Sequence, residues 1–462
     1  MTSRRQTRPR LSRTAALSWL DHRLNYERVA AGQGTFALSR MRRLLEAVGS
    51  PHEQVPVVHV AGTKGKGSTV AMIAGMLSAG GRRVGRYLSP HVHALEERIE
   101  IDGRPIDARA LTAAFETVIP VAERLDRAAA RRGTRGPTWF ELLTCVAFLH
   151  FARAKVDVAV LETGLGGRLD ATNLCRPLLT VITSISLDHM AILGNSIAKI
   201  AAEKAGIIKR GVPVVSGATH ASARRVIRAT AARRHAPLLE LGRDFSARFL
   251  GVADPTGDTP AAGVVRVRLP AVLAGPGSPE PTFSVAMAGP HQAENASLAV
   301  VAARWLDALG HTVPEDAIAA GLRRAVLPAR VQVISRRPLV VVDAAHNVAS
   351  MEALLDTLAA ALSAHRPRVL VFAASADKQI ERMLRIAAGS FDHVIVTRYA
   401  TNPRAATVER LVAACRAAGL PPAEAAGSPA DALVRARRHA RRTGLICVAG
   451  SFFLAAEMGG PG

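Results

Sequence analysis

The chain has 462 residues, 49% of them hydrophobic, and a formal net charge of +23 at pH 7. This length exceeds what one hydrophobic core usually supports, so we expect two domains. No apolar run is long enough to cross a bilayer, and no apolar segment of the secretory type follows the basic N-terminus, so we expect a cytoplasmic protein without a membrane partner. The four cysteines lie far apart, which argues against a disulfide framework or a paired-cysteine zinc site.

A net charge of this size is also typical of proteins that bind nucleic acid. The arginines, however, are spread over the whole chain, and aromatic residues make up only 4%, which leaves little surface for base stacking. We therefore expect no nucleic-acid partner, and we expect a monomer. Only seven of the 60 basic residues are lysines: Lys64, Lys66, Lys155, Lys199, Lys204, Lys209 and Lys378. An amine can be deprotonated or modified whereas a guanidinium cannot, so these lysines are candidates for chemistry.

The predicted elements of the first half indicate a parallel sheet. Residues 1–16 contain several arginines and are expected to form a disordered basic tail, followed by a helical entry from Leu17 to Leu45. From Val57 to Gly217, apolar strand-like runs alternate with helical periodicity, as in a parallel sheet with crossover helices. The predicted strands are Val57–Val60, Val156–Leu161, Leu179–Ile185 and Val212–Val215.

The second half of the sequence is expected to form a β insert, an interdomain joint and a second sheet. Residues 245–285 alternate apolar and polar positions among many Gly and Pro, which predicts a small antiparallel β insert. A helix is expected from Gln292 to Leu309, and Ala325–Arg330 is interpreted as an interdomain joint. A second strand and helix series follows, with strands at Leu339–Val342, Val369–Phe372, Val394–Val396 and Leu445–Val448. The predicted fold class is α/β: a P-loop parallel-sheet ATPase domain over residues 17–327, then a smaller Rossmann-like domain over residues 328–462.

The segment Val57–Thr69 carries the strongest functional signal. An apolar strand breaks into alternating glycines around Lys66 and then enters a helix. Glycines let a backbone wrap around phosphate oxygens, the helix N-terminus attracts the anion, and the lysine adds a point charge. The spacing differs from the general P-loop pattern, because Gly62 lies four residues before Lys66 and Gly67 separates the lysine from Ser68. A glycine-rich turn without a ligand remains the alternative; the favoured ligand is a nucleotide.

Glu162 and His189 stand where an open α/β sheet binds ligands, and Lys204 is a candidate only because it is a lysine in an arginine-rich chain. Glu162 follows a predicted buried strand and could hold Mg²⁺ beside phosphates, although a structural ion pair would also explain it. His189 follows Asp188 at the next strand end and could bind a second metal or be structural. Lys204 lies near the end of a short helix that Gly206 terminates, where a cation is favourable without any catalytic role.

Seven motifs in order resemble the folylpolyglutamate synthase/dihydrofolate synthase branch of the Mur ligase superfamily. The resemblance covers residues 17–457. The motifs are Gly-Thr-Lys-Gly-Lys-Gly-Ser, Leu-Ser-Pro-His, Glu-Thr-Gly-Leu-Gly-Gly-Arg-Leu-Asp-Ala-Thr-Asn, Asp-His-x-x-x-Leu-Gly, Glu-Lys-Ala-Gly-Ile, Pro-x-Arg and Asp-x-Ala-His-Asn.

The resemblance implies an ATP-dependent amide ligase. ATP phosphorylates a carboxylate of a pteroate or folate, and the amino group of L-glutamate then attacks the acyl phosphate. The implied partners are small molecules only: the pteroate or folate, L-glutamate and ATP. The implied cofactors are ATP and Mg²⁺ at two sites. Charge develops on the phosphoryl group and then on a tetrahedral carbon, so the protein's task is mainly positioning and cationic stabilisation.

The resemblance also implies roles for residues of the first domain. Ser89 and Glu162 bind the first Mg²⁺, and His189 binds the second. Lys204 matches a lysine that is carbamylated in this family, which converts it into a metal-supporting carboxylate and a catalytic residue beside Lys66. The residues implied to hold the nucleotide are Gly62, Thr63, Gly65, Lys66, Gly67, Ser68, Thr69 and Asn295.

Roles in the second domain follow from the same resemblance. Arg330 contacts phosphate at the joint, Asp343 and His346 face the nucleotide and glutamate, and His346 is catalytic. Ser451 and Phe452 lie near the amino acid. The pterin lies against Ala94–Glu100 of the first domain.

Four positions depart from the usual pattern and bear on substrate preference and domain closure: Lys64, Ala329, Val348 and Gln379. Two other functions remain as alternatives. One is a Mur-type ligase acting on a nucleotide-linked cell-wall precursor, which is disfavoured because only about sixty residues precede the phosphate loop. The other is a basic, nucleic-acid-dependent P-loop NTPase, for which the sequence supplies neither a groove-reading helix nor a stacking platform.

Overall fold

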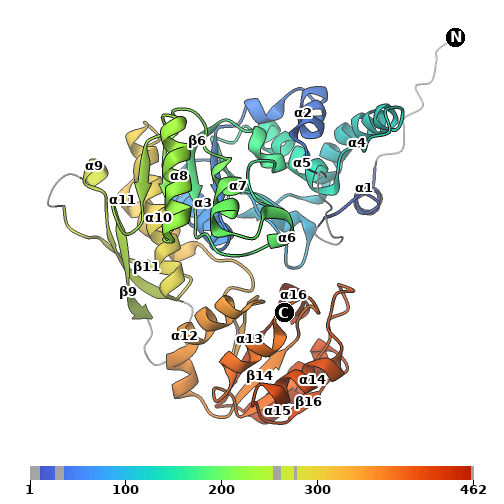
Figure 1. Ribbon diagram of the computed structural model, residues 1–462, viewed down its shortest axis with the longest axis vertical. Helices are drawn as coiled ribbons and strands as arrows, with labels where there is room; N and C mark the ends of the chain where they lie inside the picture. Colours follow the sequence, from blue (N-terminus) through green and yellow to red (C-terminus); the bar gives the residue numbers. More distant parts are fainter. Residues whose placement is uncertain (1–10, 27–35, 253–261, 275–277, 459–462) are drawn as a thin grey trace.

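The computed structural model describes residues 11–26, 36–252, 262–274 and 278–458. Two α/β units follow each other along the chain, the first drawn in blue to yellow and the second in orange and red (Figure 1). The predicted basic tail lies outside the described residues as far as residue 10. From residue 13 the prediction is wrong, because Arg13–Asp21 forms helix α1. Ser12 caps this helix by accepting from the Ala15 amide at 3.1 Å, and Ala16 and Leu20, four positions apart, are buried.

An eight-stranded sheet forms the centre of the first unit in the described ranges, in the order β4-β3-β2-β5-β1-β6-β7-β8. Strands β2, β5, β1, β6, β7 and β8 pair in parallel, whereas β3 and β4 form an antiparallel edge. Strands β2, β3, β4 and β8 were not predicted from the sequence. The bounds are β1 Val57–Ala61, β2 Val84–Tyr87, β3 Ile99–Ile101, β4 Arg104–Pro105, β5 Val158–Glu162, β6 Pro177–Ile182, β7 Val214–Ser216 and β8 Leu238–Glu240.

Both faces of this sheet are buried, because alternate side chains of each strand enter two different cores. Val58 and Val60 of β1 pack with α3, α10 and α11, whereas Val57 packs with α2, α4 and α5. This explains why its central strands are continuous apolar runs. The covering helices are α2 Leu38–Ala47, α3 Lys66–Ala79, α4 Ala108–Ala130, α5 Trp139–Ala154, α6 Met190–Leu193, α7 Ile197–Ala205, α8 Ala221–Arg233, α10 Pro290–Ala308 and α11 Glu315–Arg324. Short 3-10 turns occupy η1 Pro51–Glu53, η2 Leu95–Arg98 and η3 Ala171–Leu174.

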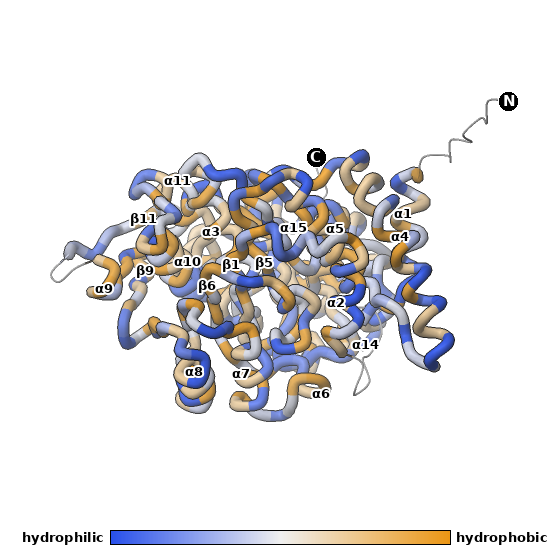
Figure 2. Tube along the Cα trace, turned by 90° about the horizontal axis from the view of Figure 1, so that it is seen from above, coloured by the Kyte–Doolittle hydropathy of each residue, from blue (hydrophilic) through white to orange (hydrophobic). Residues whose placement is uncertain are grey.

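The predicted β insert is present as an antiparallel sheet in the order β11-β10-β9. It lies at one edge of the first unit, beside α10 and α11 (Figure 1). Its described elements are β9 Ser246–Val252, β10 Gly263–Arg268, helix α9 Ala271–Ala274 and β11 Thr282–Val285. Hydrophobic and hydrophilic residues alternate along the outer helices such as α4 in Figure 2, as expected of helices with one buried face. No described helix combines the length and the apolar character needed to cross a membrane.

A six-stranded sheet forms the second unit within the described residues, in the order β12-β13-β17-β14-β15-β16. Its strands pair in parallel except for the edge strand β12. The strands are β12 Gln332–Arg336, β13 Leu339–Val342, β14 Arg368–Phe372, β15 His393–Val396, β16 Ala423–Ala425 and β17 Leu445–Ala449; the helices are α12 Val348–Ala364, α13 Ile380–Ala387, α14 Val408–Ala417, α15 Pro429–Ala440 and α16 Phe452–Met458. The predicted α/β class is confirmed.

The joint between the two sheets has a strained backbone. Ala329 and Val331 have φ of +55° and +48°, a left-handed conformation that costs an ordinary residue about 1–2 kcal/mol. Hydrogen bonds hold it in place, because the Val331 amide donates to Asp343 Oδ2 at 2.8 Å and the Ala344 amide donates to the Ala329 carbonyl at 2.9 Å. The joint therefore has one preferred geometry.

Replacing Ala329 by glycine is expected to lower the melting temperature less than replacing Ala325 by glycine. The two methyl groups are similarly buried, at 1% and 4% exposure. Each substitution lowers the free energy of unfolding by about 0.8 kcal/mol through the lost methyl burial and by about 0.5–1 kcal/mol through the larger entropy of the unfolded chain. Only at residue 329 does glycine relieve about 1 kcal/mol of strain, because Ala325 has a φ of −72°. Thermal melting of both variants checks this, and equal decreases would contradict a strained joint.

Candidate active site

The loop between β1 and α3 has the backbone of an anion cradle. Gly65 has a φ of +83°, and a Cβ at this position would lie 2.1 Å from Asn295 Oδ1, so only glycine fits. Helix α3 begins at Lys66, and among the described residues no side chain caps its first N–H groups. The buried Thr69 hydroxyl also makes no hydrogen bond within the described ranges. These unpaired donors fit a phosphate group at the helix N-terminus.

The loop is attached firmly to the end of β6. The Thr63 amide donates to the Ser184 carbonyl at 2.7 Å, and the Thr183 hydroxyl donates to the Lys64 carbonyl at 2.6 Å. A Cβ on Gly62 would lie 1.7 Å from Thr183 Oγ1, so a glycine at this position permits the close approach of the loop to the end of β6. Gly67 and Ser68 follow in the first turn of α3, with Ser68 buried. The cradle is therefore preformed.

Glu162, at the end of β5, faces this loop. Its Oε1 lies 3.6 Å from Lys66 Nζ, and its Oε2 accepts from the Ser89 amide at 3.1 Å. Burial raises the pKa of the Glu162 carboxyl, while Lys66, the Ser89 amide and Arg330 lower it. The structure thus brings together a carboxylate, the loop lysine and the backbone of Ser89 from three neighbouring strand ends.

Lys204 lies behind the same loop. Only 4% of the residue is exposed, and its Nζ donates to the Gly62 carbonyl at 2.6 Å. Burial and, to a smaller extent, the nearby Lys66 together lower the pKa of this amine to about 7, against the opposing effect of Asp188. The amine is therefore largely neutral above pH 7, the state in which it can act as a nucleophile.

His189 occupies the position before α6, with its side chain 57% exposed and its Nε2 3.9 Å from Asp188 Oδ1. Within the described ranges, no three or more His, Cys, Asp or Glu side chains are arranged to hold a metal ion. Mg²⁺ needs only one or two carboxylates when phosphates and waters supply its other ligands. Glu162 fits such a site. His189 and an unmodified Lys204 do not form such a site by themselves, because neither an imidazole nor an amine supplies a carboxylate.

Residues from the second sheet face this region. The Arg330 guanidinium lies 4.8 Å from the centre of the Phe452 ring, and the rings of Phe452 and His346 are 5.8 Å apart. Arg330 also acts electrostatically on Glu162, so the stack approaches the phosphate loop. His346 Nδ1 lies 2.9 Å from the Ala344 carbonyl, and burial lowers the pKa of its imidazole to about 4. In the neutral imidazole, the Nδ1 hydrogen donates to that carbonyl, so Nε2 carries no hydrogen and can act as an acceptor.

Asp343 and Ser451 have clear structural partners. Both oxygens of the buried Asp343 carboxylate accept backbone hydrogen bonds, from Val331 at 2.8 Å and Ala345 at 2.7 Å. The Ser451 hydroxyl accepts from the Phe453 amide at 3.1 Å. These contacts establish that Asp343 holds the joint, and the predicted contacts with nucleotide and glutamate stay predictions.

The predicted pterin segment folds into η2 and β3. The Glu97 carboxylate accepts from the amides of Val92 and Ala94 at 2.8 and 2.9 Å, which orders the turn after Ser89. The Arg98 side chain is buried; its Nε donates to His91 Nδ1 at 2.7 Å, and its guanidinium lies 4.8 Å from the Trp139 ring centre. Contact with a pterin stays a prediction.

Two further lysines of this region, Lys64 and Lys378, were named among the rare lysines of the sequence but were given no place in the predicted site. Lys378 acts electrostatically on Asp188, His189 and His346, so it lies close to both sides of the interface. Lys64 donates to Asn347 Oδ1 at 2.8 Å, which joins the phosphate loop to the second unit. The available signal was the rarity of lysine in this arginine-rich chain.

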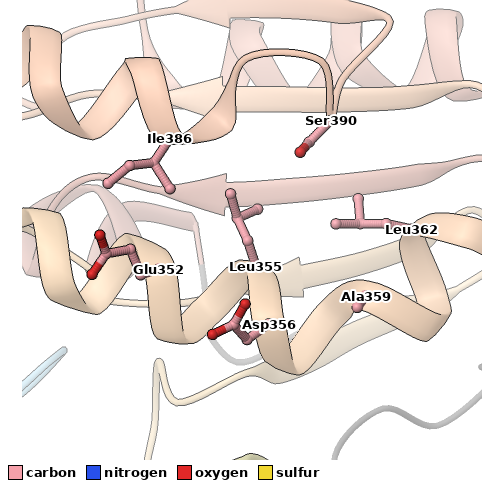
Figure 3. Close-up of a pocket in the computed structure, with 7 residues that line it drawn as sticks. All are labelled: Glu352, Leu355, Asp356, Ala359, Leu362, Ile386 and Ser390. Atoms are coloured by element: carbon pink, nitrogen blue, oxygen red, sulfur yellow. The ribbon is translucent and has the colours of Figure 1, made fainter.

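Two surface hollows of the described residues lie outside this region. One of about 510 Å³ lies between α12 and α13 and is lined by Leu355, Leu362 and other residues of these helices (Figure 3). Another of about 670 Å³ lies between α7 and α8. The loops at the ends of the parallel strands identify the candidate site instead.

Comparisons with known proteins agree with this geometry. Residues 120–303 match the Mur ligase middle domain, and residues 329–452 match the Mur ligase glutamate ligase domain. The dihydrofolate synthase/folylpolyglutamate synthase of Bacillus subtilis is 39% identical over 373 residues, covering 80% of this chain and 81% of that protein. The protein of the same description from Mycobacterium tuberculosis is 36% identical over 389 residues, covering 82% and 77%.

Solved structures give the same answer. The structure of Mycobacterium tuberculosis folylpolyglutamate synthase complexed with ADP is 32% identical, with a TM-score of 0.82, and the match covers 96% of this chain and 98% of that chain. The folylpolyglutamate synthase of Thermotoga maritima gives a TM-score of 0.81 at 31% identity, covering 96% and 95%.

These features define an ATP-dependent ligase of the Mur type. They are the two matched domains, the glycine loop with the buried Glu162 carboxylate, and Arg330 and His346, which face that loop from the second unit. Within that class, the chain belongs to the folylpolyglutamate synthase/dihydrofolate synthase family. The resemblance drawn from the seven motifs is confirmed.

Proposed function

We propose that this protein joins L-glutamate to dihydropteroate and to reduced folates, with ATP as the phosphoryl donor. One observation carries the proposal: Lys66 and Glu162 form a pair at the phosphate loop, and Arg330, stacked on Phe452, approaches that pair from the second sheet. This arrangement places cations on both sides of a phosphate that would sit at the start of α3. The relatives' names supply the acceptor and the amino acid.

The first step activates the acceptor. An oxygen of its carboxylate attacks the γ-phosphorus of ATP, the bond to the β-phosphate oxygen breaks, and ADP leaves with that electron pair. Lys66 and Ser68, with the backbone of the loop, would hold the β and γ phosphates, and Arg330 would balance the charge that develops on the transferred group. Asn295, which is within contact distance of Gly65, would support the nucleotide side of the loop.

The second step forms the amide. The nitrogen of glutamate attacks the acyl carbon, phosphate departs with the bonding electrons, and a proton leaves the nitrogen. His346 would act in this step, because its neutral imidazole is held through Nδ1 by the Ala344 carbonyl and keeps Nε2 available as an acceptor. The Phe452 ring against His346 and the neighbouring Ser451 would border the glutamate position.

Magnesium would neutralise phosphate charge when bound. Glu162 and Ser89 would hold the first ion, because the carboxylate faces the loop and Mg²⁺ accepts a carboxylate with hydroxyl and water ligands. His189 would hold the second ion together with Lys204, if carbamylation gave that lysine a carboxylate. The buried, largely neutral amine of Lys204 supports that modification.

A comparison of acceptors tests the proposed function. Purified protein with ATP and Mg²⁺ is expected to incorporate labelled L-glutamate into both dihydropteroate and tetrahydrofolate, with one ADP formed for each amide. Incorporation into only one acceptor would restrict the proposal to a single reaction. Incorporation only into a nucleotide-linked peptide precursor would overturn it in favour of another Mur-type ligase.

A further inference from the structure

Lys64 links the phosphate loop directly to the second unit. Its Nζ donates to Asn347 Oδ1 at 2.8 Å, although the two residues are 283 positions apart in the chain. The ammonium lies two residues before Lys66 in the cradle. Its partner directly follows His346 and directly precedes α12.

Both ends of this contact are rigid. On the loop side, the Lys64 carbonyl accepts from the Thr183 hydroxyl at 2.6 Å and the Ser184 hydroxyl at 3.3 Å. On the other side, Asn347 Oδ1 also accepts from the Ser350 amide at 3.0 Å and thereby caps α12. A large movement of one unit relative to the other would therefore break the hydrogen bond between Lys64 and Asn347, since the Lys64 backbone and the Asn347 side chain are both held.

Charge on both units supports the same contact. Burial lowers the pKa of Lys64, and Asp188 of the first unit and Glu352 of α12 both oppose this shift. The cation is therefore near a carboxylate from each unit. Glu352 lies on α12, at the hollow shown in Figure 3, one turn after Asn347.

We propose that Lys64 is a positioning residue whose hydrogen bond to Asn347 sets the orientation of the two units and so positions the neighbouring His346 relative to the phosphate loop. This inference rests on the proposed function, because it assigns Lys64 an effect on the second, glutamate-dependent step. A charged hydrogen bond of this kind is worth about tenfold or more in an equilibrium or rate constant. The contact acts on the geometry of the interface and leaves binding of nucleotide to the loop largely unchanged.

A double-mutant cycle tests the proposal. Lys64→Met removes the ammonium at nearly constant length, and Asn347→Ser keeps a residue that caps helices but cannot reach Lys64. Each single variant is expected to lower kcat/KM for glutamate about tenfold, and the double variant is expected to lose no more than either single one. The Kd for ADP should change less than about threefold. Lys64→Arg, which keeps a cationic donor, should recover part of the loss.

The matched control is Lys199→Met, which removes a lysine contact to Asn195 at 3.3 Å within the first unit. It should leave kcat/KM unchanged. Small-angle scattering of the chain without ligands provides a readout that is independent of activity: Lys64→Met and Asn347→Ser should increase the radius of gyration, and Lys199→Met should not.

Additive effects in the cycle with an unchanged radius of gyration would overturn the proposal. A large loss of ADP affinity in Lys64→Met would also overturn it, since Lys64 would then be a phosphate ligand. These outcomes are distinguishable from failure of the proposed function, which would show as absent glutamate incorporation by the unsubstituted protein.

Discussion

Replacing Lys66 by alanine is expected to reduce ATP-dependent glutamate incorporation by about three orders of magnitude. Removal of one preorganised charge at a reacting group costs about 10²–10³ in rate, and Lys66 is the loop cation closest to the expected γ-phosphate. Its Nζ lies 3.6 Å from Glu162 Oε1, so the substitution also removes one of the two cations that act on this buried carboxylate. ADP formation in the presence of acceptor and glutamate measures the effect.

Controls must separate a catalytic loss from unfolding. Lys66→Met keeps the length of the side chain, so its loop should remain packed while activity is still lost. Lys199→Ala, on the exposed side of α7, should be close to normal. Near-normal turnover by a folded Lys66 variant would refute the assigned role.

Replacing Lys204 by arginine is expected to reduce activity by about 10²-fold or more. Arginine keeps the positive charge but cannot form a carbamate, so the second ion would lose its carboxylate. Burial and Lys66 lower the pKa of the Lys204 amine to about 7. A lowered pKa means that the neutral, reactive amine becomes the major form above pH 7, so carbamylation should increase between about pH 6 and pH 8 at constant total CO₂ pressure.

Carbon-13 NMR of protein equilibrated with labelled CO₂ measures the modification directly. The unsubstituted protein should show a carbamate signal that is absent from Lys204→Arg. Lys209→Arg is a suitable control, because Lys209 donates to the Asn173 carbonyl at 2.8 Å in the same region and has no proposed chemical role. An unmodified Lys204 in a fully active enzyme would exclude carbamylation as a requirement.

Much of the fold could be predicted because its signals are local. Parallel strands buried on both faces are recognisable as apolar runs, which is why β1, β5 and β6 were predicted. Strand β2 was missed because its four residues, Val84–Tyr87, include a glycine and an arginine. Helix α1 was missed at its start because the many nearby arginines suggested a disordered tail, while Ser12 supplies a cap.

A site residue could be predicted where a single sequence motif contains the residue and also indicates its role. Lys66 and Glu162 follow strand ends, and the topology of a parallel sheet brings such positions together. Contacts between the two units could not be predicted in this way. Such contacts depend on how the units pack, and no local sequence pattern contains that information. Examples are the hydrogen bond between Lys64 and Asn347, the effect of Lys378 on Asp188, and the hydrogen bonds to both Asp343 oxygens at the joint.

A crystal structure of the protein with a non-hydrolysable ATP analogue and Mg²⁺ is the most direct measurement. The account predicts that the triphosphate lies at the start of α3, with its terminal phosphate between Lys66 and Arg330 and a cation at Glu162. It also predicts added density on Lys204 beside a second cation. A triphosphate bound elsewhere, or a cradle in which Lys66 and Glu162 keep their mutual contact and touch neither phosphate nor cation, would contradict the account.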